Sequence, residues 1–126
     1  MSEKYGFVYV LSNQSMPDCY KIGATCRSPS ARAEELSRST SVPQAFDVVM
    51  FAEVENPFEV ESYIHSHLDP YRISSNREFF SLSPEQMIDA CDDIADHSFL
   101  VCYGEDYTAT HGFVESKREQ TLEVVK

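Results

Sequence analysis

Basic side chains are scarce in this sequence: ten lysines and arginines stand against 21 aspartates and glutamates, for a net charge of −11. Nucleic-acid binding is driven largely by lysine and arginine, so the chain as a whole should be repelled by a polyanion. The acids are concentrated downstream, because residues 83–126 carry ten acids and three bases, whereas residues 1–52 carry five of each. An anionic substrate should therefore meet the first half of the chain.

Long apolar runs and paired cysteine motifs are also missing. No stretch approaches the roughly 18 uncharged apolar residues of a membrane span, and the N-terminal MSEKYG lacks the apolar core of a signal peptide. The four cysteines have no C-x-x-C spacing, which argues against a structural zinc site. We therefore expect a cytoplasmic protein with free thiols and no contact with a membrane.

Short strand and helix patterns fill most of the 126 residues. β-branched and aromatic runs predict four strands, and proline in a first turn after a capping residue predicts three helices. The strands are expected at residues 7–11, 20–22, 46–54 and 78–82, and the helices begin at Pro29, Pro57 and Pro84. This order predicts an α+β fold in which a small antiparallel β-sheet is flanked by helices.

Two of the helix starts resemble capping boxes, in which the first residue and one three positions on exchange hydrogen bonds. They are Asn56-Pro57-Phe58-Glu59 and Ser83-Pro84-Glu85-Gln86. In the helix that follows Asn56, the residues Val60, Ile64 and Leu68 form the expected buried stripe. This stripe leaves Glu61 and His65 together on an adjoining face, four residues apart.

The C-terminal part of the chain has a weaker pattern. Residues 99–103 can form a further strand, and residues 113–126 can form a short polar helix or a frayed tail. We expect a catalytic domain over residues 1–98 and a C-terminal extension over residues 99–126.

Between residues 5 and 95 the sequence resembles the GIY-YIG nuclease superfamily, and in particular its small phage- and bacteria-associated branch. Phe7-Val8-Tyr9 stands where that family has its first triplet, and Lys21-Ile22-Gly23 stands where it has its second. Arg32 matches the arginine of the next helix, and Glu61 matches the glutamate of a later one. The string NREFF, residues 76–80, resembles the closing motif of this branch.

The resemblance implies a metal-dependent endonuclease that hydrolyses DNA. It implies that Tyr9 is the general base, Lys21 its electrostatic partner, and Arg32 the cation that stabilises the transition state. Glu61 would be the ligand of Mg²⁺ or Mn²⁺, and His65 an accessory acid or a residue that holds water. Phosphodiester hydrolysis needs these elements, namely a base, a cation and a metal. Lys21 departs from the family pattern, which has tyrosine there, although some restriction enzymes of the superfamily use lysine.

Each of these residues also has a structural interpretation. Tyr9 can be a sheet aromatic, Lys21 an edge-strand charge, and Glu61 with His65 a solvated pair on a helix. Arg32 can pair with Glu35 on a helix surface. The alternative function is a catalytically inactive binding module of the same fold, whose acidic surface engages a basic protein or imitates DNA. A homodimer also remains open.

Overall fold

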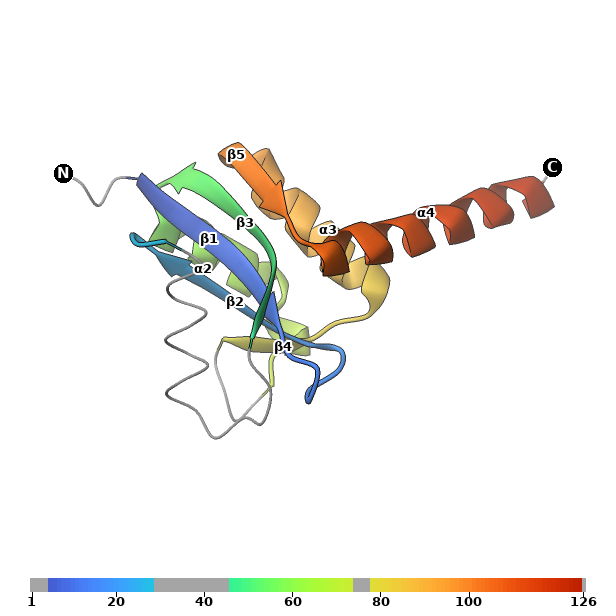
Figure 1. Ribbon diagram of the computed structural model, residues 1–126, viewed down its shortest axis with the longest axis horizontal. Coiled ribbons are helices and arrows are strands. Elements are labelled where there is room, and N and C mark those ends of the chain that lie inside the picture. The colour runs from blue at the N-terminus through green and yellow to red at the C-terminus, as the bar shows by residue number, and fades with distance from the viewer. Residues whose placement is uncertain (1–4, 29–45, 74–77, 126) are drawn as a thin grey trace.

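The computed structural model describes residues 5–28, 46–73 and 78–125. Five strands form one antiparallel sheet in the order β4-β2-β1-β3-β5, with three helices around it (Figure 1). The predicted α+β fold is therefore confirmed, whereas Arg32 and the helix predicted from Pro29 lie outside the described residues. The elements are β1 (Tyr5–Ser12), β2 (Cys19–Thr25), β3 (Asp47–Glu55), α2 (Pro57–His67), β4 (Phe79–Ser81), α3 (Pro84–Asp96), β5 (Ser98–Tyr103) and α4 (Glu105–Val125).

The β1–β2 hairpin lies at the middle of the sheet, and its register determines which side chains share a face. Tyr9 is paired with Gly23, and Leu11 is paired with Lys21. Successive side chains of a strand point to opposite faces, so these four residues lie on one face of the sheet and Val8 and Ile22 on the other.

The main core lies between the sheet and helices α2 and α3. Val8, Val10 and Ile22 pack there with residues of both helices, and the predicted stripe of α2 contributes the buried Val60 and Ile64. Leu68 is partly buried against the same core. The opposite face of the sheet carries a smaller cluster of Tyr9, Leu11 and Phe46.

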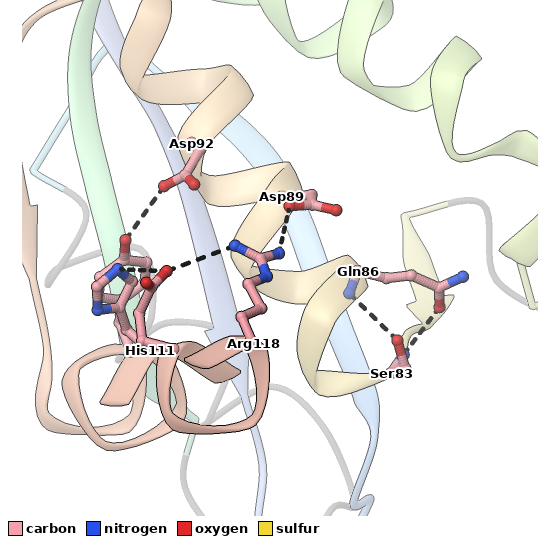
Figure 2. A network of polar contacts seen from close by, with 8 residues as sticks. Ser83, Gln86, Asp89, Asp92, His111 and Arg118 are labelled. Carbon is pink, nitrogen blue, oxygen red and sulfur yellow. Dashed lines mark hydrogen bonds and ion pairs between the residues drawn. The ribbon is translucent and has the colours of Figure 1, made fainter. Parts of the chain in front are cut away.

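The two predicted capping boxes have different outcomes. At α3 the box is formed, since Ser83 Oγ accepts from the Gln86 N–H at 3.2 Å and Gln86 Oε1 accepts from the Ser83 N–H at 2.9 Å (Figure 2). At α2 the prediction is wrong, because the Asn56 side chain makes no capping hydrogen bond. Asn56 has a left-handed backbone (φ 56°), whereas a capping side chain normally requires an extended one.

Strand β4 is short and pairs with Cys19, Tyr20 and Lys21 of β2. On its other side the chain returns antiparallel, through a bridge between Arg72 and Phe80 and a hydrogen bond from the Ile73 N–H to the Phe79 carbonyl at 2.9 Å. Because β4 begins only at Phe79, the outer edge of β2 continues past it. That edge is where the candidate site lies.

The C-terminal part of the chain forms the predicted strand and a longer helix than expected. β5 pairs with β3 at the sheet edge, and α4 begins at Glu105 rather than at residue 113. Among the α4 side chains whose burial is described, up to residue 119, Tyr107 and Val114 are buried. The helix extends away from the sheet (Figure 1). Among the described residues, none of the helices combines the length and apolarity needed to cross a membrane. The division at residue 98 stays a prediction.

Candidate active site

A pocket of about 1000 Å³ opens beside the outer edge of β2. Three of the predicted site residues line it together, although they come from β1 and from α2: Tyr9, Glu61 and His65. Lys21 does not line the pocket, but its ion-pair partner Glu78 does. Side chains that are more than fifty residues apart in the sequence therefore line one pocket.

Tyr9 is almost completely buried, with 1% of its surface exposed, in the cluster that contains Leu11 and Phe46. Its ring lies across Gly23: a Cβ added to this glycine would be 2.7 Å from Tyr9 Cζ and closer still to the phenol oxygen. A side chain at position 23 would therefore displace the phenol. Tyr9 is both a packed sheet aromatic and a residue of the pocket wall.

The Glu61 carboxylate is held against the backbone of β2. It accepts a hydrogen bond from the Ala24 N–H at the strand's outer edge. Burial raises the pKa of Glu61 above its ordinary value, and the nearby Glu78 carboxylate raises this pKa further. His65, the Ala24 N–H and Lys21 act in the opposite direction. A half-buried carboxylate beside a second one is a good place for a proton or a metal ion.

His65 contacts the same strand edge two residues away, at Ile22. Its Nε2 lies 2.8 Å from the carbonyl oxygen of Ile22, which requires Nε2 to carry the proton and donate. The ring also packs near Phe80, with 5.1 Å between centroids. Glu61 and His65 therefore contact the backbone of β2, so they do not form the solvated surface pair that their helical spacing also allowed.

Lys21 is buried, with 5% of its surface exposed, so it is not an edge-strand charge facing solvent. Its Nζ lies 3.2 Å from Glu78 Oε1 and 5.3 Å from the centroid of the Phe79 ring. The side chain shares a sheet face with Tyr9 but is paired across the hairpin with Leu11. Its role as the electrostatic partner of Tyr9 stays a prediction, whereas its ion pair with Glu78 is a feature that the sequence did not indicate.

Arg72 lines the pocket and was not singled out from the sequence. Its Nε donates to Asp69 Oδ1 at 3.1 Å, and its guanidinium carbon lies 5.1 Å from the centroid of the Phe80 ring. The pairing of its backbone with Phe80 of β4 fixes its position. The available signal was an arginine two residues after Pro70, which lies in the short 3-10 helix Asp69–Tyr71 that follows α2.

The pocket is lined by three carboxylates, those of Glu61, Asp69 and Glu78, together with the His65 imidazole. In the part of the chain that the structure describes, no three histidine, cysteine, aspartate or glutamate side chains gather as a metal-binding group. Mg²⁺ is commonly held by one or two carboxylates, with water and substrate phosphate completing its coordination. Glu61 fits this requirement, and Glu78 is a second carboxylate on the same wall.

Comparison with protein-family models gives one match: the model of the T5orf172 domain matches residues 6–95. This range contains every predicted site residue and ends near the end of α3. Comparisons with curated proteins and with solved structures found no match. The family match is compatible with a nuclease-like role.

Proposed function

Because the chain belongs to the T5orf172 domain family, we propose that it is an endonuclease of the GIY-YIG type that hydrolyses DNA phosphodiester bonds with Mg²⁺ or Mn²⁺. The observation that carries this proposal is the shared pocket of Tyr9, Glu61 and His65. A base, a metal ligand and a proton-exchanging imidazole must face one phosphate to act on it, so their convergence supports hydrolysis.

Glu61 would hold the metal ion, and Glu78 is placed to assist it. When bound, the ion would polarise a phosphoryl oxygen of the substrate. The raised pKa of Glu61 supports this assignment, because a divalent cation would offset both its burial and the nearby Glu78 charge. The hydrogen bond from the Ala24 N–H keeps the Glu61 carboxylate in place whether or not the ion is present.

Tyr9 is proposed to take a proton from the attacking water. Lys21 lies on the same face of the sheet as Tyr9, and a nearby ammonium favours the charged form of a phenol. His65 donates from Nε2 to the Ile22 carbonyl, so Nδ1 is the atom that can accept a hydrogen bond from water or exchange a proton. Arg32 remains the proposed transition-state cation, from its match in the sequence.

The test is cleavage of supercoiled plasmid DNA with Mg²⁺ or Mn²⁺. The wild-type protein should nick or cut the plasmid, and Glu61→Ala or Arg32→Ala should lower the rate about a hundredfold or more. Glu59→Ala is the matched control, because Glu59 is an exposed acid of the same helix outside the pocket. Equal rates for Glu61→Ala and Glu59→Ala would refute the assignment of the metal ligand.

A binding module is the second candidate function. The observation that favours it is the acidic surface of α3, where Asp89, Asp92 and Asp96 are exposed. Such a surface suits a basic protein partner or the imitation of DNA. If the folded wild-type protein leaves plasmid DNA intact with either metal, the binding module becomes the better explanation.

A further inference from the structure

One face of α2 lines the pocket along the whole helix. Phe58 is in its first turn, Ser62 and Ser66 follow at intervals of four residues, and Asp69 and Arg72 continue the wall past its end. Residues three or four apart lie on one side of a helix, so these side chains form the wall of a groove. An eleven-residue helix is roughly 16 Å long at about 1.5 Å per residue. At about 3.4 Å per nucleotide of a stacked strand, that length corresponds to roughly five nucleotides.

Phe58 provides an exposed aromatic ring at one end of this groove. Its surface is 53% exposed, although it lies next to the buried Pro57. The start of α2 is firmly seated, because a Cβ added to Gly6 of β1 would lie 2.9 Å from Pro57 Cγ. A large apolar ring that is exposed to solvent at a well-packed helix start is suited to stack on the face of a nucleobase.

Arg72 provides a cation at the opposite end. The contacts with Asp69 and with the Phe80 ring orient its guanidinium, and the Arg72 side chain as a whole is 26% exposed. A guanidinium has five N–H donors in a fixed plane, and this planar fork matches the geometry of phosphate oxygens. Arginine held in this way is well suited to bind a phosphate. Among the described residues that line the pocket, Arg72 is the one lysine or arginine.

We propose that this groove binds a single DNA strand along α2, with an unpaired base stacked on Phe58 and a backbone phosphate on Arg72. Bases in a duplex are stacked on one another, so an aromatic platform selects a strand whose base is free to leave the stack. Glu61 and His65 come between Phe58 and Arg72 along this wall, and Tyr9 lines the same pocket, so a phosphate between the two contacts would lie near the proposed catalytic residues. The assignment of that central phosphate as the cleaved one depends on the proposed function.

The experiment measures fluorescence anisotropy of the full chain with three labelled probes, in EDTA so that no probe is cut. The probes are a DNA single strand, the same length of strand made of abasic residues, and the corresponding duplex. Phe58→Ala should weaken binding of the single strand about tenfold and leave the abasic probe unchanged. Arg72→Ala should weaken binding of all three about tenfold and lower the salt dependence by about one phosphate contact.

Two residues of α4 provide matched controls. Phe113 has almost the same exposed fraction as Phe58, 54% against 53%. Arg118 contacts Asp89 of α3 and Glu115, away from the pocket (Figure 2). Phe113→Ala and Arg118→Ala should leave single-strand binding within about twofold of wild type, and circular dichroism checks that all four variants are folded. Equal effects of Phe58→Ala and Phe113→Ala, or of Arg72→Ala and Arg118→Ala, would overturn the proposal.

The two proposals fail in different experiments. Loss of the single-strand preference in a protein that still nicks plasmid DNA would overturn this inference and leave the nuclease assignment intact. Conversely, the protein could bind the single strand through Phe58 and Arg72 but nick no DNA. This result would support the binding groove and refute the proposed hydrolysis.

Discussion

The ring of Tyr9 lies across Gly23, its partner in the β1–β2 pair. The glycine is required by contact rather than by backbone conformation, because a Cβ at position 23 would occupy the space of the phenol. The tyrosine of the first triplet and the glycine of the second therefore form one structural unit. This unit brings the phenol from the middle of the sheet to the pocket at the outer edge of β2.

Gly23→Ala tests this unit. The new methyl group should displace the Tyr9 ring, with a loss of about 1–3 kcal/mol in the free energy of unfolding. A misplaced base typically slows an enzyme on the order of a hundredfold, so nicking should fall about that much. Gly112→Ala is the control, because nothing lies within 4 Å of a Cβ there, and it should keep full activity. Wild-type nicking by Gly23→Ala would contradict the requirement.

The Glu61 carboxyl should give stability a specific pH dependence. Its pKa is raised in the folded protein, mainly by burial, so the folded state holds this proton to higher pH than the unfolded state does. Its contribution to stability is therefore complete below the ordinary glutamate pKa and is lost as pH rises through the raised one. Glu61→Gln removes the titration and should be stabilised relative to wild type above that window.

Urea unfolding of wild type and Glu61→Gln between about pH 4 and pH 8 measures this difference. We expect the unfolding free energies of the two proteins to diverge with increasing pH. Added Mg²⁺ should reduce this difference, because it stabilises the wild-type protein alone. A difference that stays constant across the range would show that the carboxyl does not titrate as its surroundings imply.

His65→Phe should separate hydrogen bonding from packing at the strand edge. Phenylalanine keeps a ring beside Phe80 but cannot donate to the Ile22 carbonyl, so we expect a loss of about 1 kcal/mol in unfolding free energy and a loss of nicking. His67→Phe is the control: the exposed His67 contacts the Tyr63 carbonyl of its own helix, and its loss should cost about 0.5 kcal/mol at most. Chemical denaturation compares the two.

Glu78→Ala should expose the cost of burying Lys21. The Lys21 side chain is only 6% exposed, and its ammonium lies 3.2 Å from the Glu78 carboxylate. Removing this carboxylate leaves a poorly compensated charge, so we expect a loss of about 2 kcal/mol in the free energy of unfolding. Lys21→Met combined with Glu78→Ala should be more stable than Glu78→Ala alone, because the buried charge is then absent. Urea unfolding measures the stabilities of both variants. If the double variant is no more stable than Glu78→Ala, the uncompensated charge of Lys21 is not the cause of the destabilisation.

The sequence was sufficient for most of the fold because its patterns are local. β-branched and aromatic runs identified the strands, and the Ser83 capping box placed the start of α3. The Asn56 box failed because the sequence does not reveal that Asn56 has a left-handed backbone. The length of α4 was missed because it buries Tyr107 and Val114 among many polar residues, which gives little helical periodicity.

The sequence indicated three residues that share the pocket, but it did not indicate their contacts. Order and spacing indicated Tyr9, Glu61 and His65, and the pocket brings them together. The contacts with Ala24, Ile22 and Gly23 involve backbone or the absence of a side chain, so no residue type signals them. Arg72 is placed by the return of the chain along β4, which is a tertiary relationship that local patterns do not contain.

The brevity of β4 has a consequence for how this scaffold can change. If β4 were extended by three residues toward its N-terminus in the same register, its main chain would reach the level of Ala24. It would then compete for the amide of Ala24 and the carbonyl of Ile22, which Glu61 and His65 now occupy. The sheet would gain backbone hydrogen bonds, and the pocket would lose the backbone contacts that hold Glu61 and His65. An insertion in front of Phe79 that lengthens β4 should therefore remove both contacts without unfolding the sheet. Strand length alone would then decide whether Glu61 and His65 keep the positions that the proposed hydrolysis needs.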